Sequence, residues 1–146
     1  MSHISVVIAE GPLLEEAFRV RRAVFVEEQA VPPEEEWDEL DAVATHFAAL
    51  SEGVGVVGTA RLVREGTAGR VGRMAVLKEW RRQGVGAALM EAVLHHAEDL
   101  GLETLFLHAQ THAKDFYARF GFRPEGDLFY EAGIEHVKMG RRVVGS

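Results

Sequence analysis

The pattern of apolar and polar residues predicts short strands that alternate with helices along the first half of the chain. Residues 4–9 alternate like a strand, and the helix that follows Gly11-Pro12 has an apolar face formed by Leu13, Leu14, Ala17 and Phe18. Residues 45–50, 55–64 and 70–77 have the composition of three strands, and turn-forming pairs separate them. The spacing therefore predicts an antiparallel meander.

The second half of the chain contains the longest predicted helix, residues 82–100. Its apolar residues recur with a period of 3.6, and Gly101 ends it. A strand candidate at 104–110 has the buried segment Leu105–Leu107 at its centre, and a short helix over 113–120 follows. Two further strands are predicted, one near 122–127 and one over 134–142. Strict alternation of strand and helix is absent, so the pattern predicts an α/β fold with a mixed sheet and helices on both faces.

Composition narrows the class of protein. A chain of 146 residues with 47% hydrophobic residues predicts one domain, residues 1–146. The absence of cysteine excludes disulfides and a cysteine nucleophile. No run of 18 apolar residues and no secretion-type N-terminus is present, so we expect a cytoplasmic protein with no membrane partner. A net charge of -7 argues against a nucleic-acid partner and is compatible with a cationic substrate such as an amine.

Residues 71–86 run from an apolar strand into a helix that opens with two arginines and two glycines. The first N–H groups of a helix lack internal partners and carry partial positive charge, so Arg81 and Arg82 are unfavourable there unless an anion is bound. Gly84 and Gly86 have no Cβ, which lets the backbone approach a ligand closely. The segment therefore predicts a phosphate site.

Two common phosphate motifs do not fit this segment. A nucleotide P-loop requires Lys followed by Ser or Thr, and Gly86-Ala87-Ala88 supplies neither. The dinucleotide fingerprint has Leu89 at its third small position, and no acidic residue ends the next strand. The remaining Arg-x-x-Gly-x-Gly pattern resembles the acyl-coenzyme A signature of the GNAT (GCN5-related) acetyltransferases. The resemblance implies acetyl-coenzyme A (acetyl-CoA) as cosubstrate, a mostly antiparallel GNAT-like sheet, and a pyrophosphate held by Arg81, Arg82, Gln83, Gly84, Val85 and Gly86.

A second segment, residues 110–122, is similar to the GNAT helix that ends in Tyr, two residues and Gly-Phe. In that family the tyrosine commonly donates a proton to the departing coenzyme A thiolate, and Tyr117 stands at the matching position. A tyrosine with a pKa near 10 is protonated at neutral pH, so it has a proton to donate to a thiolate whose conjugate acid has a pKa near 8.5. The alternative is that Tyr117 is a packing residue beside Phe116, Phe120 and Phe122.

The N-terminal segment indicates a narrower relation. Arg21–Gln29, then Asp38, Asp41, Ala44 and His46, resemble the ElaA-like branch of GNAT proteins, as does Tyr130–His136. Relatives often have a cysteine in the segment that is Gln29–Pro32 here, so no role of that side chain carries over.

Acyl transfer requires a group that deprotonates the amine and backbone donors for the developing oxyanion. The resemblance implies that the strand with Met74, Ala75 and Val76 splays from its neighbour and binds the pantetheine arm, with the N–H near Val76 facing the thioester carbonyl. No covalent enzyme intermediate is needed. Four residues in the matched segments are candidate bases, each with an ordinary structural alternative: Glu28, His46, Glu131 and His136.

The sequence thus predicts an acetyl-CoA-dependent N-acetyltransferase acting on a small amine, an amino sugar or a protein amine. The alternatives are a glucosamine-phosphate acetyltransferase and a noncatalytic acyl-CoA sensor. A homodimer is plausible because strand edges can pair.

Other features predict packing or solvation rather than chemistry. We expect no metal, since His95 and His96 point about 100° apart on a helix, and His108 and His112 lie across a strand-to-loop break. We expect the acidic run Glu34–Glu36 to form a solvated loop. We expect Trp80 to be a packing residue.

Overall fold

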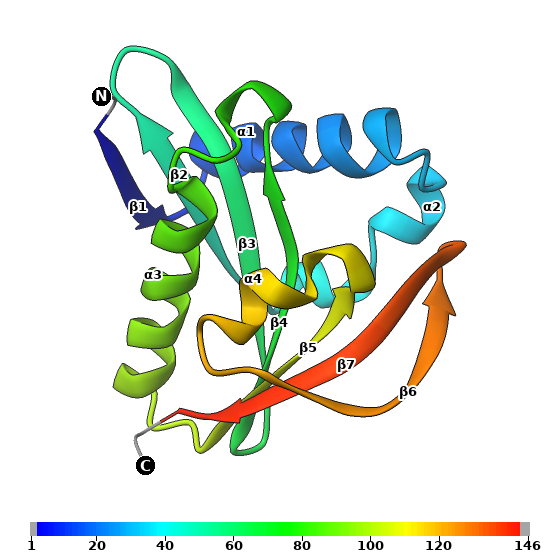
Figure 1. Ribbon diagram of the computed structural model, residues 1–146. Coiled ribbons are helices and arrows are strands. Elements are labelled where there is room, and N and C mark those ends of the chain that lie inside the picture. The colour runs from blue at the N-terminus through cyan, green and yellow to red at the C-terminus, as the bar shows by residue number, and fades with distance from the viewer. Residues whose placement is uncertain (1–2, 144–146) are drawn as a thin grey trace.

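The computed structural model describes residues 3–143 and contains a seven-stranded sheet with helices on both faces (Figure 1). The sheet has the order β1-β2-β3-β4-β5-β7-β6. All neighbouring strands are antiparallel except β4 and β5, which are parallel. This arrangement confirms the predicted mixed, mostly antiparallel sheet. The strands are β1 (Ile4–Ile8), β2 (Thr45–Ser51), β3 (Gly55–Glu65), β4 (Ala68–Val76), β5 (Thr104–Gln110), β6 (Arg123–Glu131) and β7 (Ile134–Arg142).

The helices divide between the two faces of the sheet, with α3 and α4 in front and α1 behind in Figure 1. The α-helices are α1 (Pro12–Arg21), α2 (Pro33–Glu36), α3 (Val85–Asp99) and α4 (Lys114–Ala118). A π-helical segment, η1 (Arg22–Glu28), continues α1 directly. Short 3-10 turns complete the set: η2 (Glu39–Ala42), η3 (Lys78–Trp80) and η4 (Thr111–Ala113). No helix in the described part of the chain is long and apolar enough to cross a membrane.

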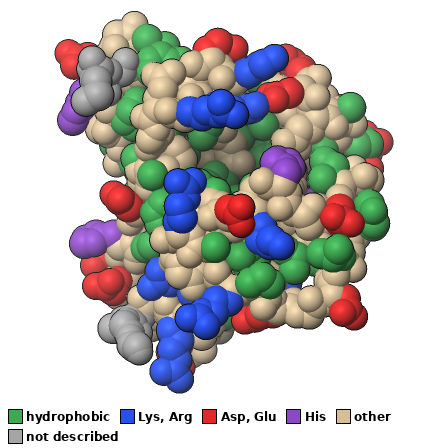
Figure 2. Space-filling model, viewed as in Figure 1, with side chains coloured by type: hydrophobic (Ala, Val, Ile, Leu, Met, Phe, Trp, Pro, Cys, Tyr) green, Lys and Arg blue, Asp and Glu red, His purple; other side chains and the backbone are tan. Residues whose placement is uncertain are grey.

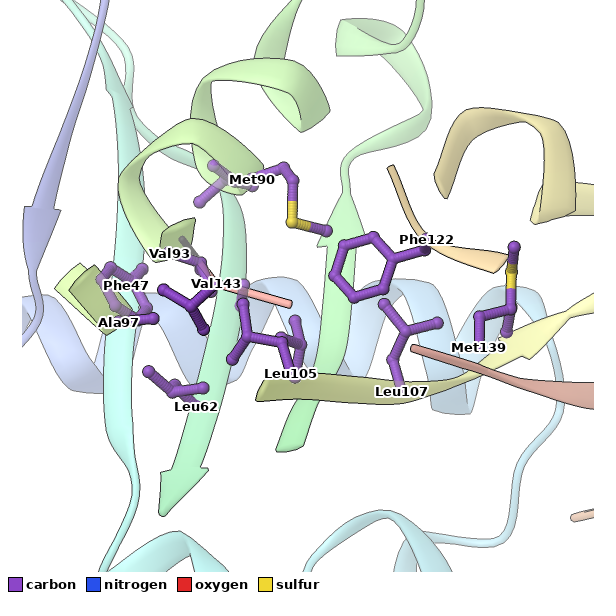
Figure 3. Packing of buried hydrophobic residues seen from close by; sticks show 14 of the residues in the cluster. Phe47, Leu62, Met90, Val93, Ala97, Leu105, Leu107, Phe122, Met139 and Val143 are labelled. Atoms are coloured by element: carbon purple, nitrogen blue, oxygen red, sulfur yellow. The ribbon is translucent and has the colours of Figure 1, made fainter. Parts of the chain in front are cut away.

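The main core lies between α3 and the front face of the sheet (Figure 3). Met90 and Val93 from α3 are fully buried there, together with Leu105 and Leu107 from β5. Since side chains alternate along a strand, Phe106, His108 and Gln110 project from the opposite face of β5. A second apolar cluster beneath α1, including Ala17 and Val20, covers part of that face.

The sheet opens between β4 and β5. The two strands pair only from Ala68↔Thr104 to Val71↔Leu107, although both continue beyond that point. On its other side, β4 has a bulge against β3, because Arg61 pairs with Gly72 whereas Thr59 pairs with Ala75. Arg73, within the bulge, has a positive φ of 50°. The bulge and the lost pairing leave the end of β4 free to line a cavity.

Several predicted bounds differ from the structure by one or two residues, and three predictions of local structure are wrong by more. Helix α3 begins at Val85 rather than at residue 82, because Arg82 (φ 64°) and Gly84 (φ 85°) are left-handed and cannot belong to an α-helix. The acidic run Glu34–Glu36 lies in α2 instead of a solvated loop, and the Glu36 side chain is buried. Strand β6 continues to Glu131, beyond the expected end near residue 127.

Candidate active site

A cavity of about 1350 Å³ opens where β4 and β5 separate. Figure 2 shows the hollow on this face of the molecule, with Lys and Arg side chains gathered around it. Its walls come from segments far apart in the sequence: η1, α2, the ends of β4 and β5, the start of α3, α4 and the β6–β7 turn. All of the predicted coenzyme-binding residues except Gln83 line it.

The loop before α3 presents free backbone donors to this cavity. The helix begins at Val85 without a side-chain cap, and the N–H of its fourth residue, Ala88, donates to the Gly84 carbonyl at 3.0 Å. The N–H groups of Val85, Gly86 and Ala87 therefore have no partner within the helix. A Cβ on Gly86 would lie 3.2 Å from the Phe116 ring, so this glycine also lets α4 pack against α3. Gln83 is exposed and donates from its side chain to the Glu79 carbonyl at 3.0 Å.

Arg81 is held away from the helix start. Its Nε donates to the Val76 carbonyl at 3.0 Å, and its two terminal nitrogens each donate to Glu28 at 2.6 Å. The Arg81 hydrogen bonds lower the pKa of Glu28 below its usual range. The bidentate pair therefore links η1 to the end of β4, and it makes the Glu28 carboxylate a weaker base. Arg82 is exposed and lines the cavity.

The end of β4 turns backbone donors toward the cavity. Leu77 N–H donates to Val57 C=O in β3 at 3.0 Å, so the preceding residue, Val76, directs its N–H and C=O away from β3. The Val76 carbonyl accordingly meets Arg81. Met74 lines the same cavity, whereas Ala75 pairs with Thr59 in β3.

Tyr117, on α4, lines the same cavity. Its ring contacts Phe116 and Phe122, with centroid distances of 5.1 and 6.3 Å. Burial raises the Tyr117 pKa to about 12, so the phenol stays protonated at neutral pH. No hydrogen bond is found for this hydroxyl within residues 3–143, and no polar side-chain atom there is both sealed from solvent and unpartnered. The hydroxyl is thus a donor without a protein partner among these residues, on a side chain that lines the cavity.

The predicted base candidates divide between two places. His46 does not line the cavity: its ring packs edge-on against Phe18, and its Nε2 lies 2.9 Å from the Asp41 carbonyl oxygen. Glu131 and His136 do line it. His136 Nδ1 lies 2.6 Å from the Ile134 carbonyl, which fixes the ring with its Nδ1–H donating.

Sequence reasoning missed His108, on β5, as an active-site candidate. Its Nδ1 lies 2.7 Å from Glu131 Oε2 and 3.2 Å from an Arg70 terminal nitrogen, and all three residues line the cavity. The alternation of the buried residues in β5 was a usable signal, because it places His108 and Gln110 on the face away from α3. Gln110 donates to the Gln29 side chain at 2.9 Å, which connects β5 to the residue that follows η1.

A network of buried ion pairs forms the wall beside α2. Arg21 donates to Glu36 at 2.6 Å and to Asp41 at 2.7 Å, and Arg61 contacts Asp41 at 2.8 Å. Arg61 also contacts Asp38 at 2.7 Å, while Arg73 reaches both Glu36 (2.9 Å) and Asp38 (3.2 Å). Burial raises the Glu36 pKa against the opposing effect of Arg21. We call this set, Arg21, Glu36, Asp38, Asp41, Arg61 and Arg73, the arginine–carboxylate network.

Comparison with known proteins agrees with this geometry. Residues 12–143 match the profile of the acetyltransferase (GNAT) domain. The chain belongs to the GNAT acetyltransferase family. The uncharacterized N-acetyltransferase YjcF of Bacillus subtilis is 41% identical over 127 residues, which cover 86% of this chain and 90% of YjcF.

Solved structures of GNAT proteins share the fold. An acyl-CoA N-acyltransferase from Pseudomonas aeruginosa is 30% identical with a TM-score of 0.80, and Escherichia coli ElaA is 27% identical with a TM-score of 0.80. In both cases the match covers 97% of this chain and 99% of the other. The likeness to ElaA confirms the predicted branch of the family.

Proposed function

We propose that this GNAT protein is an acetyl-CoA-dependent N-acetyltransferase, in which a primary amine attacks the thioester directly in a ternary complex. The observation that carries this proposal is the opening between β4 and β5, because free backbone donors and the Tyr117 hydroxyl meet in one cavity there. The acceptor class is a small amine, an amino sugar or a protein amine.

The residues at the start of α3 suit a pyrophosphate. The unpaired N–H groups of Val85, Gly86 and Ala87 would donate to phosphate oxygens, and exposed Arg82 would add a positive charge. Arg81 would act differently from the expectation: its charge is compensated by Glu28, and it holds the end of β4 in place.

The reacting centre would lie along β4. The N–H groups of Met74 and Val76 would bind the pantetheine arm and the thioester carbonyl, and donors fixed in advance stabilise the oxyanion that develops during attack. Tyr117 would donate its proton to the thiolate as the C–S bond breaks. Because its pKa is raised to about 12, this donation would be coupled to uptake of the second proton from the former amine nitrogen, which restores the phenol.

A Tyr117→Phe variant tests the proposal. We expect kcat to fall by about 10²-fold or more because the acid is lost, while acetyl-CoA affinity is retained since the ring still packs. Thermal unfolding with acetyl-CoA gives the binding readout: ligand at 100 times its Kd stabilises by about 2.7 kcal/mol. Tyr130→Phe is the matched control, since Tyr130 is 70% exposed.

Each alternative function gives a different result in this experiment. A noncatalytic acyl-CoA sensor would show the thermal shift but no turnover in the wild type or the variant. If acetyl-CoA gives no shift while NADH or ATP does, the proposed function is wrong. A glucosamine-phosphate acceptor would need a cation for the sugar phosphate, but Arg61 and Arg73 already pair with Asp38.

A further inference from the structure

We propose that His108 is the general base of the acyl transfer, and that Glu131 positions its ring. This inference rests on the proposed N-acyltransferase function. The pair joins two strands that are not neighbours in the sheet, since His108 is on β5 and Glu131 ends β6 beyond β7. Their side chains meet at the cavity, with 2.7 Å between His108 Nδ1 and Glu131 Oε2.

The surroundings select one tautomer of His108. A carboxylate oxygen 2.7 Å from a ring nitrogen requires a proton between them, because two lone pairs at that distance repel. Nδ1 therefore carries the proton and donates to Glu131. The Arg70 terminal nitrogen lies 3.2 Å from the same Nδ1 and 3.9 Å from Glu131 Oε2. Since a guanidinium only donates, this contact would favour an unprotonated Nδ1, and the shorter contact with the carboxylate decides the tautomer. The basic lone pair is left on Nε2.

The Nε2 atom is not sealed from solvent, and His108 lines the cavity. Nε2 makes no hydrogen bond within the described residues, and none of their polar side-chain atoms is both sealed from solvent and unpartnered. The Phe129 ring packs edge-on against the imidazole at 5.0 Å, which holds its plane. His108 is therefore fixed on two sides and free at the nitrogen that could accept a proton.

His108 stands where the strands separate. The last β4–β5 pair is Val71↔Leu107, so His108 is the first residue of β5 beyond the pairing. Met74 lies three residues beyond Val71 on β4. His108 and Met74 therefore both lie beyond the last pair of the two strands, and both line the cavity.

The other candidates are less suited to accept a proton. Glu28 is held ionised by Arg81, which lowers its pKa. His136 is oriented by the Ile134 carbonyl, a neutral group, and the residue is 7% exposed. Glu131 carries a charge that stabilises the imidazolium formed when His108 takes a proton, as the carboxylate does in a Ser-His-Asp triad.

The proton balance is complete without another reactant. Nε2 takes one proton from the substrate ammonium, and the neutral amine nitrogen then forms a C–N bond to the thioester carbon. The C–S bond breaks, and the thiolate receives the Tyr117 proton, which is replaced by the second proton leaving the former amine nitrogen. His108 releases its proton to solvent through the open cavity.

The tautomer is measured first, by ¹⁵N–¹H correlation spectra of the full chain at about pH 8, where a histidine is mostly neutral. We expect Nδ1 protonated and Nε2 unprotonated for His108, and loss of this preference in Glu131→Ala. A protonated Nε2 in the wild type would overturn the proposal, and this readout requires neither turnover nor acetyl-CoA.

Kinetics test the catalytic role with acetyl-CoA, benzylamine or putrescine as the acceptor probe, and release of the coenzyme A thiol as the readout. His108→Gln should lower kcat/KM for the amine by about 10²- to 10⁴-fold, and should remove the decline in rate at acidic pH that follows protonation of the base. Glu131→Gln, whose amide oxygen can still accept from Nδ1, should lose less than Glu131→Ala.

Other charged groups face His108, and the controls account for them. Arg70 approaches from β4, and Lys138 and His136 lie on β7, with Lys138 directly opposite His108. His136→Gln should keep the acidic decline in rate, and the exposed His95→Gln on α3 is the matched control for folding. If His136→Gln removes the decline and His108→Gln does not, His108 is not the base.

Failure of this inference is distinguishable from failure of the proposed function. If His108→Gln binds acetyl-CoA and retains wild-type turnover, the base is another group, and the acetyltransferase function stands. If the wild type shows no thermal shift with acetyl-CoA, the function itself is wrong, whatever the tautomer of His108. If the wild type binds acetyl-CoA but turns over with neither amine, the tautomer measurement decides: Nδ1–H with a free Nε2 supports the proposal, and the reverse overturns it.

Discussion

At the residue scale, the arginine–carboxylate network shows how the protein tolerates buried charge. Arg21 is 1% exposed, and its guanidinium donates to Glu36, to Asp41 and to the Glu36 backbone carbonyl. It also packs over the Trp37 ring, with 4.6 Å from its central carbon to the ring centroid. Such a group is stable only while every partner is present, because an unpaired buried charge is costly.

Arg21→Met should therefore destabilise the fold by about 3 to 5 kcal/mol, since it leaves Glu36 and Asp41 without their shared donor. Urea unfolding followed by circular dichroism measures the loss. Arg22→Met is the matched control, because the neighbouring Arg22 is exposed and its replacement should change stability by less than about 0.5 kcal/mol. Equal stability of the two variants would contradict the structural role of Arg21.

At the scale of elements, the conformation of the loop that leads into α3 depends on residues with left-handed backbone angles, Arg82 and Gly84. Gly84 has φ 85° and no atom within 4 Å of a hypothetical Cβ, so its role is conformational and not a matter of space. Left-handed backbone here ends the extended segment at Arg81 and starts the helix at Val85, which leaves the first amides turned toward the cavity.

Gly84→Ala should lower stability by about 1 to 2 kcal/mol and should also weaken acetyl-CoA binding, because relaxation of the strained backbone would move the α3 amides. Gly66→Ala is a close match: Gly66 has φ 64°, also has open space around it, and lies in the distant β3–β4 turn. We expect both variants to lose similar stability, but only Gly84→Ala to bind acetyl-CoA with a higher Kd, measured by calorimetry. Equal affinities in both variants would show that the loop does not bind the cosubstrate.

At the scale of the whole molecule, contacts between remote segments close the cavity. Arg81 and Glu28 join the end of β4 to η1, Gln110 joins β5 to Gln29, and Arg73 joins β4 to α2 through the arginine–carboxylate network. These contacts hold η1, Gln29 and α2, all from the N-terminal third of the chain, against the ends of β4 and β5. Because charged pairs form much of this attachment, global stability should depend on pH.

The pKa of Asp38 determines in which direction one part of this stability changes with pH. The Arg61 hydrogen bonds lower its pKa in the folded state, so ionised Asp38 stabilises the fold above the unfolded pKa near 3.9, and this contribution is lost as pH falls through the lower folded value. Asp38→Asn should therefore be less stable than wild type at pH 7, and the difference should shrink as pH falls below about 4. Denaturant unfolding at several pH values measures it, with exposed Glu39→Gln as control; a difference independent of pH would contradict this role.

Local patterns predicted most of the elements, because each depends on neighbours in the sequence. The 3.6-residue period marked the body of α3, alternation marked β7 over Ile134–Arg142, and the Arg-x-x-Gly-x-Gly segment was placed correctly between strand and helix. The start of α3 was missed because apolar periodicity does not report the φ angle of Arg82. The burial of Glu36 was missed because its partners, Arg21 and Arg73, are 15 and 37 residues away.

The sequence by itself determined the family, the mixed sheet and the segments that line the cavity, because these depend on local periodicity and on contiguous motifs. Only the tertiary structure decided which of the titratable side chains meet one another and which of them line the cavity. Pairing across strands brought His108 to Glu131 and set Glu28 against Arg81, while packing against Phe18 left His46 outside the cavity. The physical reason is that the protonation state of a side chain depends on its neighbours in space, and strand order and register establish those neighbours.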